Sequence, residues 1–252
     1  MTDTQNMTDT QLATSQFQAG SVMSRGFAIF FRNFVPFMLL AGLVFSPLIV
    51  YTALIDLSLD NPNLVDAIQT WMIVVIAGSI PLGMLLSATL VYGTFQQLRG
   101  QPASIGECLS YGIGRIFPVL GVALLAGLCI ILGLVLLVIP GVIVATMLWV
   151  AIPVAVVERP GIVASLRRST ELTSGNRWRI LGILVVLNVI ERVMSFIIEN
   201  AVLENIALYL AMSLVIAAFI AAIDSVITAV GYHDLRVAKE GVDTSQIASV
   251  FD

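Results

Sequence analysis

Six long apolar stretches, separated by short polar connections, constrain this chain more than any other feature of its sequence. A helix needs roughly 20 mostly apolar residues to cross the hydrocarbon core of a bilayer. Only 11% of the 252 residues are charged and 58% are hydrophobic, so too few charges remain to cover a water-soluble core of this size. The sequence therefore predicts an all-α polytopic membrane protein and excludes a soluble enzyme, a disordered chain and a secreted disulfide scaffold. The six transmembrane helices are expected at about 34–56, 71–93, 117–139, 140–157, 179–198 and 206–231.

The basic residues predict which side of the membrane each connection faces. Eleven of the twelve lysines and arginines lie before the first span, after the second and fourth spans, or after the sixth, and the twelfth, Arg192, lies within the fifth. The other connections, at 57–70, around Pro140 and at 199–205, carry acidic residues or no charge. Cytoplasmic connections are enriched in lysine and arginine. We therefore expect a multi-pass protein of the bacterial cytoplasmic (inner) membrane with both termini in the cytoplasm.

The chain is expected to form a single membrane domain over 21–240, between a polar tail at 1–20 and a short cytoplasmic tail at 241–252 that could hold a further helix. Residues 1–20 contain no basic residue and no apolar run, so they are predicted to be a flexible tail and not a targeting segment. Each odd-numbered span follows an amphipathic stretch, which predicts interfacial helices on the cytoplasmic side of three membrane hairpins. Two explanations fit this pattern. One is a true threefold sequence repeat, and the other is the alternation that any six-span protein with cytoplasmic connections shows. The three stretches are 22–34, 104–116 and 161–173.

The polar composition leaves little room for a metal, a cofactor or a nucleic acid. One histidine, His233, and two cysteines cannot build a metal site by themselves. The net charge of -4 argues against nucleic acid, which needs a concentrated basic face. No catalytic acid–base pair is apparent, so we expect a protein that is not an enzyme and holds no cofactor.

Ionisable residues within the spans are the first candidate functional group. They are costly in hydrocarbon and normally face protein or water. On the fifth span, Asn188, Glu191 and Arg192 lie on one helical stripe, and Asp224 lies on a stripe of small and polar residues on the sixth span. The two stripes predict either a solute path or two helices that pack through polar contacts. Arg192 is expected to extend toward the membrane surface with Glu191 or Glu199 as its partner, and not to pair with Asp224.

The cytoplasmic arginines are the second candidate group. They set the topology, and they also predict contacts with anionic lipid headgroups. The first functional hypothesis is accordingly a non-enzymatic membrane protein that binds lipid or organises the membrane, and the alternative is a small-solute transporter or channel. No protein partner can be named. The candidate headgroup contacts are Arg115, Arg159, Arg167, Arg168, Arg177 and Arg179.

Two stretches carry a resemblance to a known family. Residues 152–178 read IPVAVVERPGIVASLRRSTELTSGNRW, and residues 232–241 read YHDLRVAKEG. Together they resemble the membrane domain that is attached to some bacterial glycerophosphoryl diester phosphodiesterases and that also occurs as stand-alone membrane proteins. The resemblance implies the membrane part alone, because the phosphodiesterase domain of such proteins is a separate soluble barrel. It brings no catalytic residues to this chain.

Three local patterns predict details of packing and assembly. Ile139-Pro140-Gly141 predicts a tight turn between the third and fourth spans. Ala123 and Gly127 form a small-xxx-small pair that predicts a close helix–helix approach on the third span. Tyr232-His233-Asp234 predicts an anchor at the end of the sixth span. A monomer and a homo-oligomer are both compatible with the sequence.

Overall fold

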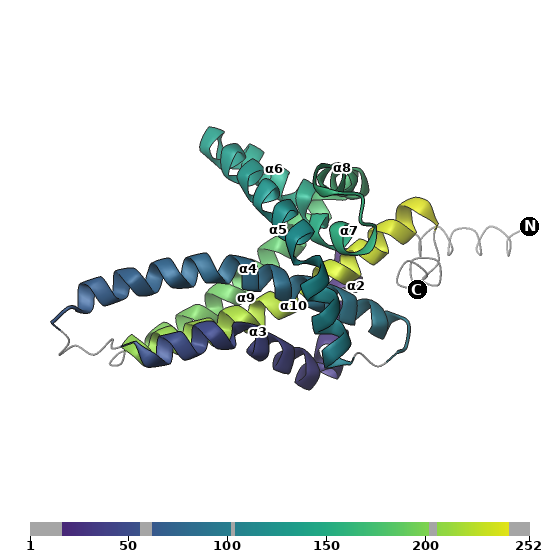
Figure 1. Ribbon diagram of the computed structural model, residues 1–252. Coiled ribbons are helices and arrows are strands. Elements are labelled where there is room, and N and C mark those ends of the chain that lie inside the picture. The colour runs from purple at the N-terminus through teal and green to yellow at the C-terminus, as the bar shows by residue number, and fades with distance from the viewer. Residues whose placement is uncertain (1–16, 56–61, 102–103, 202–205, 242–252) are drawn as a thin grey trace, which may run out of the picture.

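The computed structural model describes residues 17–55, 62–101, 104–201 and 206–241, and these residues contain helices and no strand (Figure 1). Six helical segments are long and apolar enough to cross a membrane, which confirms the predicted all-α polytopic fold. The helices are α2 (Ala19–Arg32), α3 (Phe34–Leu54), α4 (Leu64–Leu98), α5 (Ile105–Leu136), α6 (Val138–Leu148), α7 (Ala151–Val157), α8 (Ile162–Thr173), α9 (Arg177–Ala201) and α10 (Ile206–Glu240).

Two of the helices extend well beyond the predicted spans. Helices α4 and α10 have 35 residues each, which corresponds to about 52 Å at 1.5 Å per residue. A bilayer core is only about 30 Å thick, so these helices continue outside it. Because α4 begins at Leu64, it takes up much of the connection expected at 57–70. Hydropathy predicts only the part of a helix that lies in the hydrocarbon core. The backbone hydrogen bonds of the helix continue beyond that part.

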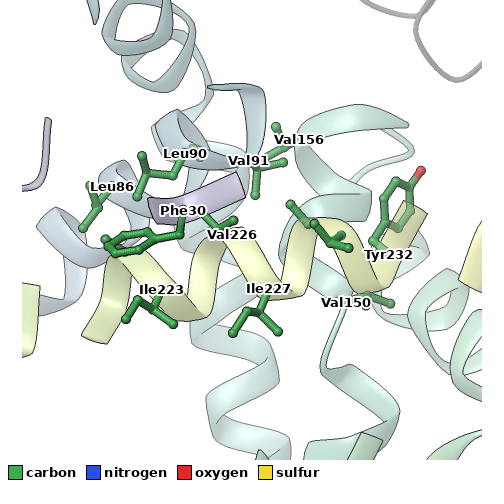
Figure 2. Packing of buried hydrophobic residues seen from close by; sticks show 14 of the residues in the cluster. Phe30, Leu86, Leu90, Val91, Val150, Val156, Ile223, Val226, Ile227 and Tyr232 are labelled. Carbon is green, nitrogen blue, oxygen red and sulfur yellow. The ribbon is translucent and has the colours of Figure 1, made fainter. Parts of the chain in front are cut away.

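Helix α10 is the centre of the molecule and packs against α2, α3, α4 and α9. Figure 2 shows Phe30 from α2 and Leu86, Leu90 and Val91 from α4 gathered along α10. The rings of Phe30 and Phe219 lie 5.6 Å apart in an edge-on arrangement. The chain therefore folds around its last helix, which packs against segments that are distant in the sequence.

Two of the three stretches predicted to be interfacial helices form separate helices, and their position at the membrane surface stays a prediction. Helices α2 and α8 are separate helices, but the stretch at 104–116 forms the first turns of the continuous helix α5. In α2 the buried face consists of Val22, Gly26, Ile29 and Phe30, and a Cβ atom on Gly26 would lie 2.7 Å from Ile227. Two other aromatic residues of the stretch 22–34, Phe31 on α2 and Phe34 at the beginning of α3, are exposed. Contact with α10 thus decides which face of α2 is buried.

Helices α5 and α6 form a hairpin that points away from the bundle of α3, α4, α9 and α10 (Figure 1). Its turn is at Leu137, whose backbone is extended, and Pro140 lies in the first turn of α6. The turn predicted at Ile139-Pro140-Gly141 is therefore wrong by a few residues, because proline is well tolerated in the first turn of a helix. A Cβ atom on Gly133 would lie 2.9 Å from the Cα atom of Gly141, so the hairpin closes through backbone contact.

Three further expectations need correction. Phe17 is buried with 2% of its surface exposed and α2 begins at Ala19, so residues 17–20 belong to the fold and not to a tail. A Cβ atom on Gly127 would meet nothing within 4 Å, so the Ala123–Gly127 pair makes no close helix contact. Tyr232 is buried well inside α10 and does not mark its end. The predicted tail at 1–16 and the segment at 242–252 lie outside the described residues.

The tip of the α5–α6 hairpin provides a topological prediction. Residues 134–143 contain no polar side chain, and Val135, Leu136, Leu137, Val138 and Ile139 are all exposed to the surroundings of the protein. Such a surface is stable in hydrocarbon and costly in water.

We expect a cysteine at Leu137, in a chain whose Cys108 and Cys129 are replaced by alanine, to resist a membrane-impermeant maleimide added to intact cells. A cysteine at the exposed Asn63, in the first polar connection, serves as the accessible control. Equal labelling at both positions would show that the hairpin tip emerges into water.

Candidate functional site

The six candidate arginines lie in four different environments. Arg168 on α8 is held within the protein by Glu158, at 3.0 Å, and by Glu240 at the end of α10. Burial lowers the pKa of Arg168, but its hydrogen bonds to Glu240 and Glu158 outweigh this effect and raise that pKa above its ordinary value. Since its charge is already neutralised by two carboxylates, Arg168 is a structural residue and a poor candidate for lipid contact.

Glu158 is the centre of a polar cluster that joins α7, α8 and α10. It accepts hydrogen bonds from the Arg168 guanidinium and, at 2.9 Å, from the Tyr232 hydroxyl. Arg236 lies 4.0 Å from Glu158 and 2.9 Å from Glu240. Sequence reasoning missed this cluster. The spacing of Tyr232, Arg236 and Glu240 places the three residues on one helical face, but nothing in the sequence indicates Glu158 as their partner.

Arg167 and Arg179 lie at the surface. Arg167 pairs with Glu171 at 3.1 Å, one helical turn away, and 82% of its side chain is exposed. Arg179 donates hydrogen bonds to the Phe17 carbonyl at 2.8 Å and to Asn176 at 3.2 Å, so it connects α9 to the segment before α2. Exposed pairs of this kind contribute little to stability. Both side chains are exposed at the surface of the protein.

Arg115 and Arg159 lie together, although they are 44 positions apart in the sequence. Both guanidinium carbons lie 5.8 Å from the centre of the Tyr111 ring. Both residues also line a pocket of about 110 Å³ between α5, α7 and α8. Within the part of the chain that the structure describes, neither guanidinium is within ion-pair distance of a carboxylate. The sequence offered no sign of this juxtaposition.

Arg177 lies at the beginning of α9 and borders an apolar groove between α6 and α9. This groove, called here the α6–α9 groove, has a volume of about 510 Å³, and its walls include Val138, Val142 and Leu181. The Nε atom of Arg177 is buried and has no hydrogen-bond partner among the described residues. Buried donors are nearly always paired, so this atom marks a place where an acceptor is expected. The adjacent Trp178 is 86% exposed.

The groove continues along α9 beyond Leu181. A second hollow of about 560 Å³ shares Val142 and Leu181 with the first and includes Asn188 and Arg192 among its lining residues. From Arg177 to Arg192 the groove follows α9 for about 22 Å. One leaflet contributes about half of the 30 Å hydrocarbon core, so the groove is longer than one leaflet is thick.

The intramembrane stripe is divided between two places. Asn188 and Arg192 face the α6–α9 groove, whereas Glu191 lines a separate cavity of about 130 Å³ between α9 and α10. Asp224 is not among the residues that line this cavity, and its side chain is exposed. Among the described residues, Arg192 forms no ion pair with Glu191, Glu199 or Asp224. The solute path therefore stays a prediction. Glu191 and Ser195 on α9 face Ser213 on α10 across this cavity.

Metal ligands do not gather anywhere in the described ranges, where no three His, Cys, Asp or Glu side chains are placed to hold an ion together. His233 lies at 3.2 Å from Asp234, which also receives Arg25 from α2 at 2.8 Å. The ion pair between Arg25 and Asp234 joins α2 to α10.

Comparisons with known proteins identify a family. Residues 105–235 match a family described as a domain of unknown function, DUF7847. The match begins with α5 and ends within α10. It therefore includes the α6–α9 groove, the pocket that Arg115 and Arg159 line, and Glu158 with its partners Arg168 and Tyr232. No curated protein and no solved structure matches the chain. The resemblance to the phosphodiesterase-associated membrane domain stays a prediction.

Proposed function

We propose that this chain, which belongs to the DUF7847 family, is a non-enzymatic integral membrane protein that binds anionic phospholipid through its cytoplasmic arginines. The membrane is the bacterial cytoplasmic membrane, and both chain termini lie in the cytoplasm. The distribution of lysine and arginine along the sequence supports this orientation.

The observation that carries the proposal is the position of Arg177 at the α6–α9 groove. Arg177 is one of the residues that line this groove, and guanidinium groups form strong charge-assisted hydrogen bonds with phosphate oxygens. The apolar walls formed by Val142, Leu181 and their neighbours fit an acyl chain of the same lipid. A charged end and an apolar channel in one groove match the two parts of a phospholipid.

Trp178 supports the same placement of the headgroup. Tryptophan is enriched where membrane and water meet, because its ring is apolar and its N–H is polar. Trp178, with 86% of its surface exposed beside Arg177, supports a position of the beginning of α9 at the headgroup level. The acyl chain then runs from this level into the membrane along α9. Lipid binding of this kind also organises the membrane, because it gathers anionic lipids next to the protein.

Replacing Arg177 by alanine is expected to weaken the binding of phosphatidylglycerol about tenfold. The lost hydrogen bond to a charged group is worth roughly 1.5–3 kcal/mol, and 1.4 kcal/mol corresponds to a factor of ten. Native mass spectrometry of the detergent-purified chain, titrated with phosphatidylglycerol or phosphatidylcholine, measures the effect.

Arg32→Ala is the control, because Arg32 is another of the arginines expected in the cytoplasm but lies on α2 and does not line the groove. We expect this control to bind phosphatidylglycerol like the wild type, and Arg177→Lys to retain part of the binding. The proposal is refuted if the wild type binds both lipids equally, or if Arg177→Ala binds phosphatidylglycerol as tightly as the wild type.

A further inference from the structure

We propose that the pocket formed by Arg115 and Arg159 binds the dianionic phosphate group of a phosphate monoester. This pocket, called here the Arg115–Arg159 pocket, is distinct from the α6–α9 groove, and the proposal does not depend on the lipid site at Arg177. It lies where the middle of α5, the end of α7 and the beginning of α8 meet.

Tyr111 holds the two arginines in place. Its hydroxyl donates a hydrogen bond to the Val156 carbonyl at 2.9 Å and accepts one from Arg159 at 3.1 Å. Its ring stacks on Tyr92 with the centroids 4.4 Å apart, which fixes the orientation of the ring. Both guanidinium groups lie 5.8 Å from the centre of this ring, within the range of cation–π attraction. The two charges are therefore positioned by a tyrosine that is itself fixed by α4 and α7.

The pair of positive charges lacks a counter-charge. In the described part of the chain, no carboxylate is within ion-pair distance of either arginine, whereas the nearby Arg168 is neutralised by Glu158 and Glu240. Two like charges that share one pocket repel each other, and an anion between them relieves this repulsion. A phosphate monoester carries a charge of about -1.5 to -2 at pH 7, which matches two guanidinium groups.

The backbone of Arg159 supplies an independent observation. With a φ of 57°, Arg159 is the one residue other than glycine with a positive φ in the described ranges. It follows the C-cap of α7, where the chain usually has glycine because a side chain is strained in this conformation. Glycine would end α7 at lower cost, so ending the helix does not explain the arginine. Strained residues of this kind are concentrated at binding sites, and here the conformation directs the guanidinium toward Tyr111 and the pocket.

The remaining walls restrict the size of the ligand. The pocket of about 110 Å³ has the volume of three or four water molecules, taking about 30 Å³ for each. This accommodates one phosphate group and leaves the rest of the ligand outside. Gly161 and Ser165 line the side toward α8, and the Ser165 hydroxyl donates to the Gly161 carbonyl at 2.7 Å. The ligand therefore presents a terminal phosphate, either on a lipid such as phosphatidic acid or as free phosphate or a soluble phosphorylated compound.

The test uses the full chain in detergent and in lipid nanodiscs. Isothermal titration calorimetry with inorganic phosphate measures binding of the free ion at constant ionic strength. Native mass spectrometry of nanodiscs that contain phosphatidic acid in phosphatidylcholine measures binding of the lipid. Saturable binding of inorganic phosphate identifies a soluble source of the phosphate, and binding of phosphatidic acid alone identifies the membrane as the source.

Arg159→Gly is the decisive variant. It removes the guanidinium and relieves the backbone strain, so the variant is expected to melt at the same or a higher temperature while its affinity for phosphate or phosphatidic acid falls at least tenfold. Arg115→Ala should weaken binding to a similar extent. Arg167→Ala, which removes an exposed arginine on the same side of the protein, should bind like the wild type.

Two results would overturn the proposal. One is a wild type that binds neither phosphate nor phosphatidic acid, and the other is an Arg159→Gly variant that binds either of them as tightly as the wild type. Arg177→Ala separates this proposal from the lipid site. It should leave inorganic phosphate binding unchanged, so a failure at one site is distinguishable from a failure at the other.

Discussion

Replacing Glu158 by alanine is expected to lower the free energy of unfolding by about 3 kcal/mol. Glu158 neutralises Arg168, accepts a hydrogen bond from the buried Tyr232 hydroxyl and lies 4.0 Å from Arg236. Removing one partner of a buried ion pair leaves the others desolvated without compensation, which costs about 3–5 kcal/mol. Because the side chains of Arg168 and Glu158 remain partly exposed to solvent, we expect a loss of stability at the lower end of this range.

Unfolding of the detergent-solubilised protein by increasing mole fractions of SDS, followed by circular dichroism, measures this loss. Glu171→Ala is the matched control, since Glu171 also pairs with an arginine, but on an exposed helix face where such a pair is worth about 0.3–0.5 kcal/mol. Glu158→Gln should be intermediate, because the amide oxygen still accepts a hydrogen bond from Tyr232. Equal stability of Glu158→Ala and Glu171→Ala would show that the cluster around Glu158 does not hold α7, α8 and α10 together.

Replacing Gly112 by leucine is expected to destabilise the protein by about 3 kcal/mol, because it forces α5 away from α4. A Cβ atom on Gly112 would lie 2.2 Å from the Thr89 hydroxyl oxygen and 3.2 Å from the Thr89 backbone nitrogen. Thr89 is buried, and its hydroxyl is held by the Leu85 carbonyl at 2.7 Å. Overpacking of a filled site costs about 1–3 kcal/mol, and here backbone lies behind the first contact, so the upper end applies.

The matched control is Gly127→Leu on the same helix, where a Cβ atom would meet nothing within 4 Å. Leucine is about 1 kcal/mol more favourable than glycine within a helix, so this variant should be as stable as the wild type or slightly more stable. Thermal unfolding in detergent, monitored by tryptophan fluorescence, compares the two variants. A similar loss of stability in both would mean that the close approach of α5 to α4 at Gly112 does not decide the outcome.

Sequence reasoning succeeded where a property depends on the hydropathy of one segment. The six spans, the all-α fold and the helices at α2 and α8 could be predicted because the bilayer imposes a length and an apolar composition on each segment independently. It failed at the α5–α6 turn and at the length of α4 and α10. Helix ends depend on local backbone hydrogen bonds, which hydropathy does not report.

The candidate site was predictable in its residue types but not in its arrangement. Charge distribution along the sequence indicated the arginines in the connections between spans, yet it gave no reason to distinguish Arg168 from Arg177. The structure separates them: Arg168 is neutralised by Glu158 and Glu240, whereas Arg177 has a buried, unpaired donor at the edge of an apolar groove. Glu240 lies 72 residues from Arg168, and Val142 in the groove wall lies on α6, far before Arg177 in the sequence, so no local spacing rule reaches these neighbours.

The sequence by itself determined that the chain lies in a membrane, how many segments can cross it and which connections carry the positive charge. These properties follow from the transfer of each segment between water and lipid, and transfer free energies are nearly additive along a chain. Only the tertiary structure decided that α10 is the central helix, that Gly112 and not Gly127 lies at a close contact, and that Arg115 and Arg159 share one pocket. The physical reason is that lipid is as apolar as most of these side chains, so hydropathy cannot select partners within the membrane. Close packing and polar contacts between distant segments make that selection.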